Sequence, residues 1–231
     1  GAHAAANRRR SEDGASDEKP VHKVRITKGF WLGKHEVTNA QYRAYCEATG
    51  KTFPTDSAQG DDHPVVNVSW NDAKAYCDHY SLSLPTEAQW EYACRAGTST
   101  RFHWGKSASW DVSGRYSWHM FNTGVKRHRD NQLWWVKYHK VQKTGTRRAN
   151  AFGLHDMCGN VSEWCFDRYD SSSYTGSEKS DPVGWRGNYS HRVVRGGSVL
   201  DSPADFSSYR RWALGAFEKQ HTTGIRLVLP E

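Results

Sequence analysis

Several features that define other protein classes are missing from this sequence of 231 residues. No run of about 18 apolar residues is present, which argues against a membrane-spanning helix. There is also no nucleophile elbow, no phosphate-binding glycine loop and no HExxH helix. The basic segments carry no nucleic-acid-binding motif, so we interpret the net charge of +7 as a solvated basic surface.

Cysteine is scarce and irregularly spaced. The five cysteines form no CxxC pair, which argues against zinc-binding and thioredoxin-like sites, and none follows Cys165. An odd number allows at most two disulfides and leaves one thiol over, while a fully reduced set fits the sequence equally well. The cysteine pattern therefore fits an oxidising compartment and a reducing one equally well.

Aromatic residues are abundant, with 11 Trp and 11 Tyr. They favour a core built on ring packing, which suits a loop-rich fold. Residues 1–20 have almost no apolar content and are expected to form a flexible arm. Residues 21–231 are of a length that fits a single domain.

Capping boxes predict the starts of three short helices. In each one a hydroxyl residue is followed three positions later by a side chain that can reach back to the first free amide. The boxes are Thr38 with Gln41, Ser69 with Asp72, and Thr86 with Gln89. Alternating residues predict strands at 24–27, 30–37, 192–195 and 223–229, while 170–190 is expected to be a long loop. Short helices separated by loops favour an α+β fold.

Residues 150–167 form the segment around which the other motifs are arranged. Two glycines in this segment allow tight turns, and oxygen donors follow closely at Asp156, Asn160, Glu163 and Asp167. A hard cation such as calcium requires about 6–8 oxygen ligands, which a turn of this kind can supply. A polar loop with internally satisfied carboxylates is the alternative.

The sequence Gly159-Asn160-Val161-Ser162-Glu163-Trp164 resembles a signature of the formylglycine-generating enzyme family, the sulfatase-modifying factors. Residues 33–42, 63–70 and 83–93 resemble other segments of the same family, so that the resemblance covers about residues 20–229. It implies a loop-rich α+β variant of the C-type lectin fold. In that fold the last strand, 223–229, pairs with the strand at 30–37.

The resemblance also implies a structural calcium ion. Its ligands would be the side chains of Asp156 and Glu163 and the carbonyls of Gly159 and Val161. Asp156 stands where the family usually has asparagine.

The copper-binding cysteine pair of these enzymes lies a few residues beyond a Gly-Gly-Ser corner. At that corner, residues 196–198, the matching positions are Asp201 and Phe206. Neither side chain replaces a thiolate, which is the ligand that monovalent copper prefers. We therefore expect a non-catalytic binding or accessory domain.

The segment 199–222 forms the binding face in lectin-like folds, and it is rich here in aromatic and charged residues. We expect it to recognise a protein or a small ligand through five residues, with a core role as the alternative for Tyr209 and Trp212. The five are Asp201, Phe206, Tyr209, Arg211 and Trp212. Residues 125–138 resemble an insertion, in which Trp134 and Trp135 either contact a partner or fold back onto the domain.

Two other functions remain as alternatives. A divergent metal-dependent oxidoreductase would use the same groove with another metal. A variable ligand-binding protein of the retroelement type would carry sites derived from asparagine codons. Changes at adenines alone do not convert asparagine into Trp212 or Glu218, which argues against the second alternative.

Overall fold

The computed structural model describes residues 15–54, 60–123, 140–174, 179–184 and 190–230. The predicted insertion at 125–138, with Trp134 and Trp135, lies outside the described residues, as do residues 1–14 of the predicted arm. The helices are α1 (Asn39–Thr49), α2 (Trp70–His79), α3 (Glu87–Arg95) and α4 (Trp110–Ser113), with 3-10 turns η1 (Ser16–Glu18) and η3 (Pro203–Asp205). The strands are β1 (Val24–Arg25), β2 (Phe30–Leu32), β3 (Ser162–Arg168), β4 (Lys179–Ser180), β5 (His191–Arg195), β6 (Arg211–Gly215), β7 (Thr223–Gly224) and β8 (Val228–Pro230).

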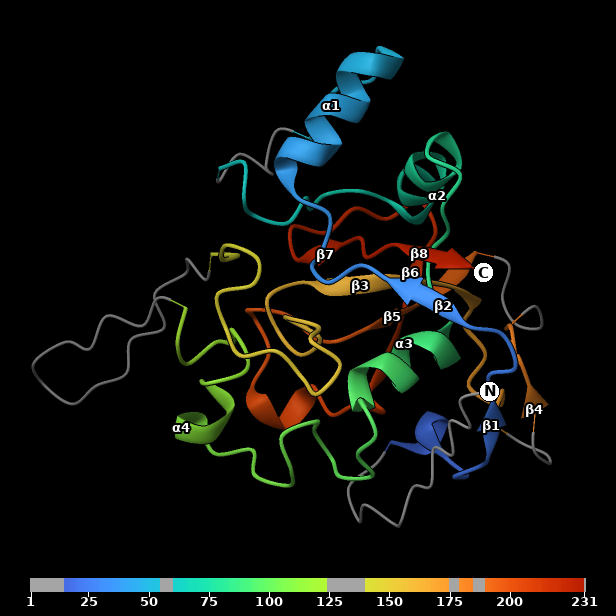
Figure 1. Cartoon of the computed structure of the whole chain (residues 1–231), viewed down its shortest axis with the longest axis vertical. Coiled ribbons are helices and arrows are strands. Elements are labelled where there is room, and N and C mark those ends of the chain that lie inside the picture. The colour runs from blue at the N-terminus through green and yellow to red at the C-terminus, as the bar shows by residue number, and fades with distance from the viewer. Residues whose placement is uncertain (1–14, 55–59, 124–139, 175–178, 185–189, 231) are drawn as a thin grey trace, which may run out of the picture.

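The main sheet has four strands in the order β6-β5-β3-β7. β5 runs antiparallel to both β3 and β6, whereas β3 and β7 are parallel. In Figure 1, α1 and α2 lie on one side of these strands and α3 on the other. β3 and β6 had not been predicted as strands from the sequence.

The two ends of the domain are joined by strand pairing. β2 pairs antiparallel with β8, so that Leu32 lies opposite Val228, and the amide of Val37 bonds to the carbonyl of Ile225 at 2.8 Å. This confirms the expected pairing of the last strand with the strand near the N-terminus. β1 pairs with β4 instead of with β2, so the segments at 24–27 and 30–37 do not form a hairpin with each other.

All three predicted capping boxes are present at the starts of α1, α2 and α3. The Thr38 hydroxyl accepts from the Gln41 amide, and the Gln41 side chain accepts from the Thr38 amide at 2.9 Å. α1 ends at Gly50, whose φ of 68° places it in the left-handed region that favours glycine. These helix boundaries are set by local sequence.

The core forms on both faces of the main sheet because side chains alternate along its strands. Trp164 and Val194 join the aromatic cluster under α1 and α2, and their neighbours Cys165 and Val193 join the cluster under α3. The sheet is thus buried on both faces.

The predicted boundary of the arm is too late in the chain. Glu18 is buried, and its carboxylate lies 3.4 Å from the guanidinium of Arg210. The Tyr169 hydroxyl donates to Asp17 at 2.5 Å. Residues 15–20 therefore pack on the domain through polar contacts, which hydrophobicity alone does not reveal.

Among the helices of the described residues, none has the length and apolar character of a membrane span.

The turn before β3 provides a test of backbone packing. Gly153 and Gly159 both have positive φ, but a Cβ at Gly159 would lie 2.2 Å from the Trp118 carbonyl oxygen, whereas a Cβ at Gly153 would meet no atom within 4 Å. Gly153→Ala is therefore expected to cost only backbone strain, about 1 kcal/mol, and Gly159→Ala about 3 kcal/mol or more. Urea unfolding of the two variants measures the difference, and equal losses would contradict the close approach.

Candidate functional site: buried charges along β3

The loop that leads into β3 is held by one asparagine. The Asn150 amide nitrogen donates to the carbonyl of Ala93 at 2.7 Å, and its oxygen accepts from the amides of Phe152 and Leu154 at 3.0 and 3.1 Å. Asn150 therefore fixes the loop against the end of α3. Positive φ values at Asp156 (57°) and Asn160 (60°) turn the chain twice before β3 begins.

Glu163 on β3 forms a fully buried ion pair with Arg226. The guanidinium reaches Glu163 Oε1 at 2.7 Å through Nη2, and Nε lies 2.9 Å from the same oxygen and 3.0 Å from Oε2. The Trp90 indole on α3 donates to Oε2 at 2.6 Å. The rest of the guanidinium donates to the carbonyls of Gly33 and His155, both at 2.8 Å.

The positive charge of Arg226 also acts on two further carboxylates, Glu36 and Asp156. Glu36 Oε1 accepts from Asn160 Nδ2 at 3.1 Å and Asp156 Oδ2 from the Gly145 amide at 2.6 Å. The second oxygen of each is buried and has no hydrogen-bond partner among the described residues. Burial, and after it the charge of Asp156, raises the pKa of Glu36 well above its usual value. Three carboxylates around one arginine need a proton or a cation for balance.

The predicted calcium ligands can be compared with this arrangement. The unpartnered Oδ1 of Asp156 suits a hard cation, but both oxygens of Glu163 are committed to Arg226 and Trp90. Glu36, which sequence reasoning missed, supplies an unpartnered oxygen that Glu163 does not. No group of three or more His, Cys, Asp or Glu side chains in the described ranges is arranged to hold a metal. The calcium ion stays a prediction.

A second network of charges surrounds the start of α3. Arg211 donates two hydrogen bonds to the Glu87 carboxylate, from Nε to Oε1 at 2.9 Å and from Nη2 to Oε2 at 2.6 Å. Arg195, completely buried, pairs with Glu91. It also donates to the carbonyls of Tyr209 and Arg210. This network fastens β5 and β6 to α3.

The same network corrects the predicted ligand-binding set. Phe206 is fully buried, Tyr209 is 6% exposed and Arg211 is 3% exposed, so none of the three can form part of an open binding face. Arg211 is drawn inward by Glu87 and Phe206 by the apolar cluster under α3. Asp201 closes its own turn by accepting from the amide and the hydroxyl of Ser198, both at 2.8 Å.

The segment 199–222 does not form one continuous surface, because the strand β6 divides it. Before β6, the Asp201 carbonyl accepts from the Met120 amide, so that this part lies beside residues 118–123. After β6, the carbonyls of Ala216 and Gln220 accept from amides at the start of α2 and just before it. Trp212 lies half-buried within β6. The large exposed side chains near these parts are Leu200 (40%), Phe121 (46%) and Phe217 (82%).

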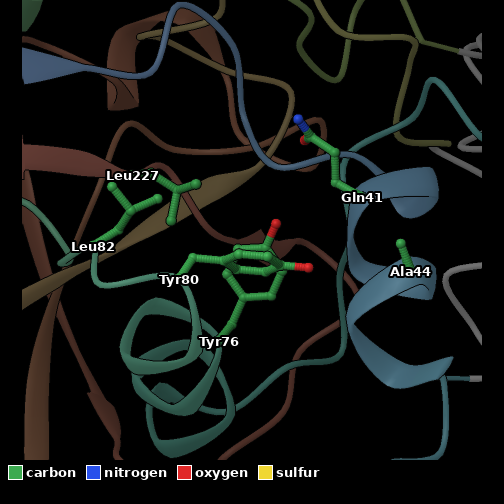
Figure 2. A pocket seen from close by; sticks show the side chains of 6 residues that line it. All are labelled: Gln41, Ala44, Tyr76, Tyr80, Leu82 and Leu227. Carbon is green, nitrogen blue, oxygen red and sulfur yellow. The ribbon is translucent and has the colours of Figure 1, made fainter. Parts of the chain in front are cut away.

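An open groove of about 470 Å³ lies elsewhere, between α1, the end of α2 and Leu227, the residue before β8. Figure 2 shows the rings of Tyr76 and Tyr80 side by side on one wall, tilted relative to each other, with their hydroxyls directed toward α1. Gln41, Ala44, Leu82 and Leu227 complete the lining. None of the five predicted ligand residues lines this groove.

Comparison with known proteins agrees with this architecture. The model of the sulfatase-modifying factor enzyme 1-like domain family matches residues 4–230, and the chain belongs to this family. It is 31% identical over 246 residues to the formylglycine-generating enzyme of Streptomyces coelicolor, covering 85% of this chain and 75% of that protein. It is also 32% identical over 167 residues to the inactive C-alpha-formylglycine-generating enzyme 2 of Bos taurus, covering 64% of this chain and 50% of that protein.

Two solved structures have the same fold. Variable protein 1 of Treponema denticola superposes with a TM-score of 0.75 at 22% identity, covering 93% of this chain and 89% of that one. PvdO of Pseudomonas aeruginosa superposes with a TM-score of 0.75 at 23% identity, covering 94% and 86%. The predicted α+β fold, the formylglycine-generating-enzyme variant of the C-type lectin fold, is confirmed.

Asp167 makes the stability of the domain depend on pH. Its carboxyl accepts from the amides of Glu87 and Gly184 at 2.7 and 2.6 Å, and burial, with the charge of Glu87, raises its pKa to about 7. The unfolded pKa is near 4, so this carboxyl stabilises the fold below pH 4, and its contribution is lost as the pH rises toward 7.

The free energy of unfolding of the wild-type protein is expected to fall through Asp167 by up to about 1.4 kcal/mol per pH unit between pH 5 and 7. Asp167→Asn should lack this contribution to the decline. Above pH 7.5 the free energies of unfolding of the two proteins should change with pH in the same way. Urea unfolding across the pH range measures the slopes, with Asp205→Asn in the exposed part of η3 as the control. An unchanged slope in Asp167→Asn would contradict a protonated Asp167.

Proposed function

We propose that the chain is a non-catalytic member of its family that works by contact, as a binding or accessory domain for a protein or small ligand. The observation that carries this proposal is the corner after Gly197. Asp201 closes a turn and the phenyl ring of Phe206 fills the core, at the two positions that the resemblance assigns to copper-binding thiolates. All five cysteines are buried, which supports a surface without an accessible thiol.

Enzymatic activity is tested with a peptide thiol substrate of the family, oxygen and monovalent copper, using the Streptomyces coelicolor enzyme as the positive control. No peptidyl aldehyde and no oxygen consumption are expected from this chain, because a thiolate pair has to bind the copper. Aldehyde formation, or stoichiometric iron or copper in the purified protein, would instead establish the divergent oxidoreductase.

The contact surface that we propose uses the exposed residues near the two parts of 199–222. Phe217, at 82% exposure, is the most prominent of these side chains, and Phe121 and Leu200 lie on segments joined by the bond from the Met120 amide to the Asp201 carbonyl. Exposed aromatic and aliphatic side chains of this kind are typical anchors of protein interfaces.

A photo-reactive residue at Phe217 or Leu200 is expected to capture one specific partner in the native source. The matched control is the same residue at Phe152, which is 49% exposed on the loop before β3. Subsequent Phe217→Ser and Leu200→Ser variants should weaken binding of the purified partner at least tenfold, the loss of about 1.4 kcal/mol that a single buried anchor supplies. Equal capture at all three positions would argue against a specific surface here.

We further propose a structural calcium ion at Asp156, with the carbonyls of Gly159 and Val161. Glu36 takes the place that the resemblance gives to Glu163. The unpartnered oxygens of Asp156 and Glu36 and their excess negative charge support this assignment. When bound, the ion would supply charge balance and rigidity to the turn before β3.

Removal of calcium with a chelator is expected to lower the melting midpoint by roughly 5–10 °C. Asp156→Ala should lose this response, whereas the exposed Asp61→Ala should keep it. A midpoint that is the same in metal-free and calcium-loaded wild-type protein would show that a proton, and no ion, balances the cluster.

A further inference from the structure

Two cysteines that are far apart in the sequence meet inside the domain. Cys94 lies in the last turn of α3 and Cys158 in the turn before β3. Their sulfur atoms are 3.9 Å apart, and both side chains are completely buried. Sequence spacing predicted no such pair.

The surroundings of the two sulfurs differ. Cys158 Sγ donates to the carbonyl of Phe206 at 3.4 Å, which keeps this thiol protonated. Cys94 Sγ donates to the carbonyl of Met157 at 3.7 Å and lies near the hydroxyl of Ser208 and the charge of Arg195. The Ser208 hydroxyl is fully buried and has no conventional hydrogen-bond partner among the described residues, so it is available to stabilise a negative charge on Cys94.

These contacts separate the reactivities of the two thiols. Burial alone would raise the pKa of Cys94, but the neighbouring Cys158 and Ser208 side chains and the positive charge of Arg195 outweigh it and bring the pKa below the usual value. Cys158 is held as a thiol by its bond to the Phe206 carbonyl. A thiol with a lowered pKa beside a second thiol is the arrangement of a nucleophilic and a resolving cysteine.

We propose that Cys94 and Cys158 form a redox-active dithiol that closes to an intramolecular disulfide when the protein meets hydrogen peroxide. The Cys94 thiolate attacks one peroxide oxygen, the O–O bond breaks, and a proton from solvent converts the departing hydroxide into water. The Cys94 sulfenic acid is then attacked by the Cys158 sulfur, which loses its proton as the second water leaves. Two thiols are oxidised, and one peroxide is reduced to two waters.

The oxidant reaches the pair when residues 202–206, around η3, open. This segment consists of η3 and irregular backbone, with Ala204 and Asp205 exposed. Arg101 ties it through a bond from its guanidinium to the Ala204 carbonyl at 2.6 Å, and Cys158 through the bond to the Phe206 carbonyl. The flanking residues are held more firmly, at the Asp201 carbonyl by Met120 and at the Tyr209 and Arg210 carbonyls by Arg195. Irregular segments with few ties open locally without global unfolding, and peroxide is scarcely larger than water.

Closure of the disulfide changes the same segment. The sulfurs must approach from 3.9 Å to about 2.0 Å, which draws Cys158 away from the Phe206 carbonyl. The anchoring bond of Phe206 is then lost at the base of residues 199–206. The inference thus goes beyond the proposed function, since it assigns an oxidation site and stands whether or not this surface binds a partner.

Peptide mapping of the native full chain tests the proposal without any substitution. Reduced protein is treated with hydrogen peroxide, alkylated and digested under non-reducing conditions. The expected product is a Cys94–Cys158 cross-linked peptide that reductant reverses, with Cys46 and Cys77 fully alkylated. A cross-link that uses Cys165, or oxidation of Cys94 to sulfinic acid with Cys158 still alkylated, would overturn the pairing.

Variants then separate the roles of the two cysteines. Cys158→Ser should leave a trappable sulfenic acid at Cys94, Cys94→Ser should give neither product, and Cys77→Ser in α2 should behave as wild type. Arg101→Ala, which removes the side-chain tie to Ala204, should speed disulfide formation severalfold with little change in the melting midpoint. Oxidation that appears only at denaturant concentrations that unfold the chain would exclude the proposed local opening.

Discussion

The ion pair between Glu163 and Arg226 is the interaction on which the rest of the structure depends. Both side chains are fully buried, and together they connect β3, the segment between β7 and β8, α3 through Trp90, and the carbonyls of Gly33 and His155. A buried charge whose partner is removed costs about 3–5 kcal/mol. The pair therefore holds several segments in one geometry and fixes how the chain ends meet the central turn.

Local signals in the sequence were sufficient for part of this fold. The capping boxes at Thr38, Ser69 and Thr86 specify helix starts through contacts three residues apart, and the structure has all of them. The strand at 192–195 and the pairing of the last strand with the strand that begins at Phe30 were also correct. These features depend on short spacing or on an extended family resemblance.

The remaining features depend on contacts that sequence spacing does not show. β3 and β6 carry charged residues at buried positions, so neither has the simple alternation of a half-buried strand. Their charges are satisfied by partners far away in the sequence, as Arg211 is by Glu87 across 124 residues. For the same reason Arg211 was mistaken for a surface residue, and the role of Glu36 was missed.

In the segment 199–222, the composition that suggested a binding face does not match which side chains are exposed. Its aromatic and cationic residues first suggested a single binding face, yet Phe206 and Tyr209 fill the core. The exposed positions, such as Leu200 and Phe217, lie on two parts of the chain on either side of β6. The interior beneath Phe206 holds the closely spaced thiols of Cys94 and Cys158, so the corner at 199–206 connects surface and core.

The pairing of β2 with β8 has a consequence for how the protein is made. Phe30 aligns with Pro230, so this small sheet joins residues separated by almost the whole length of the domain. Such a contact cannot form on the ribosome until residue 230 has emerged, and bringing together distant segments is slow. During synthesis β2 therefore lacks the partner strand that covers its edge in the folded domain, and an unpaired strand edge can pair with other chains until that partner arrives.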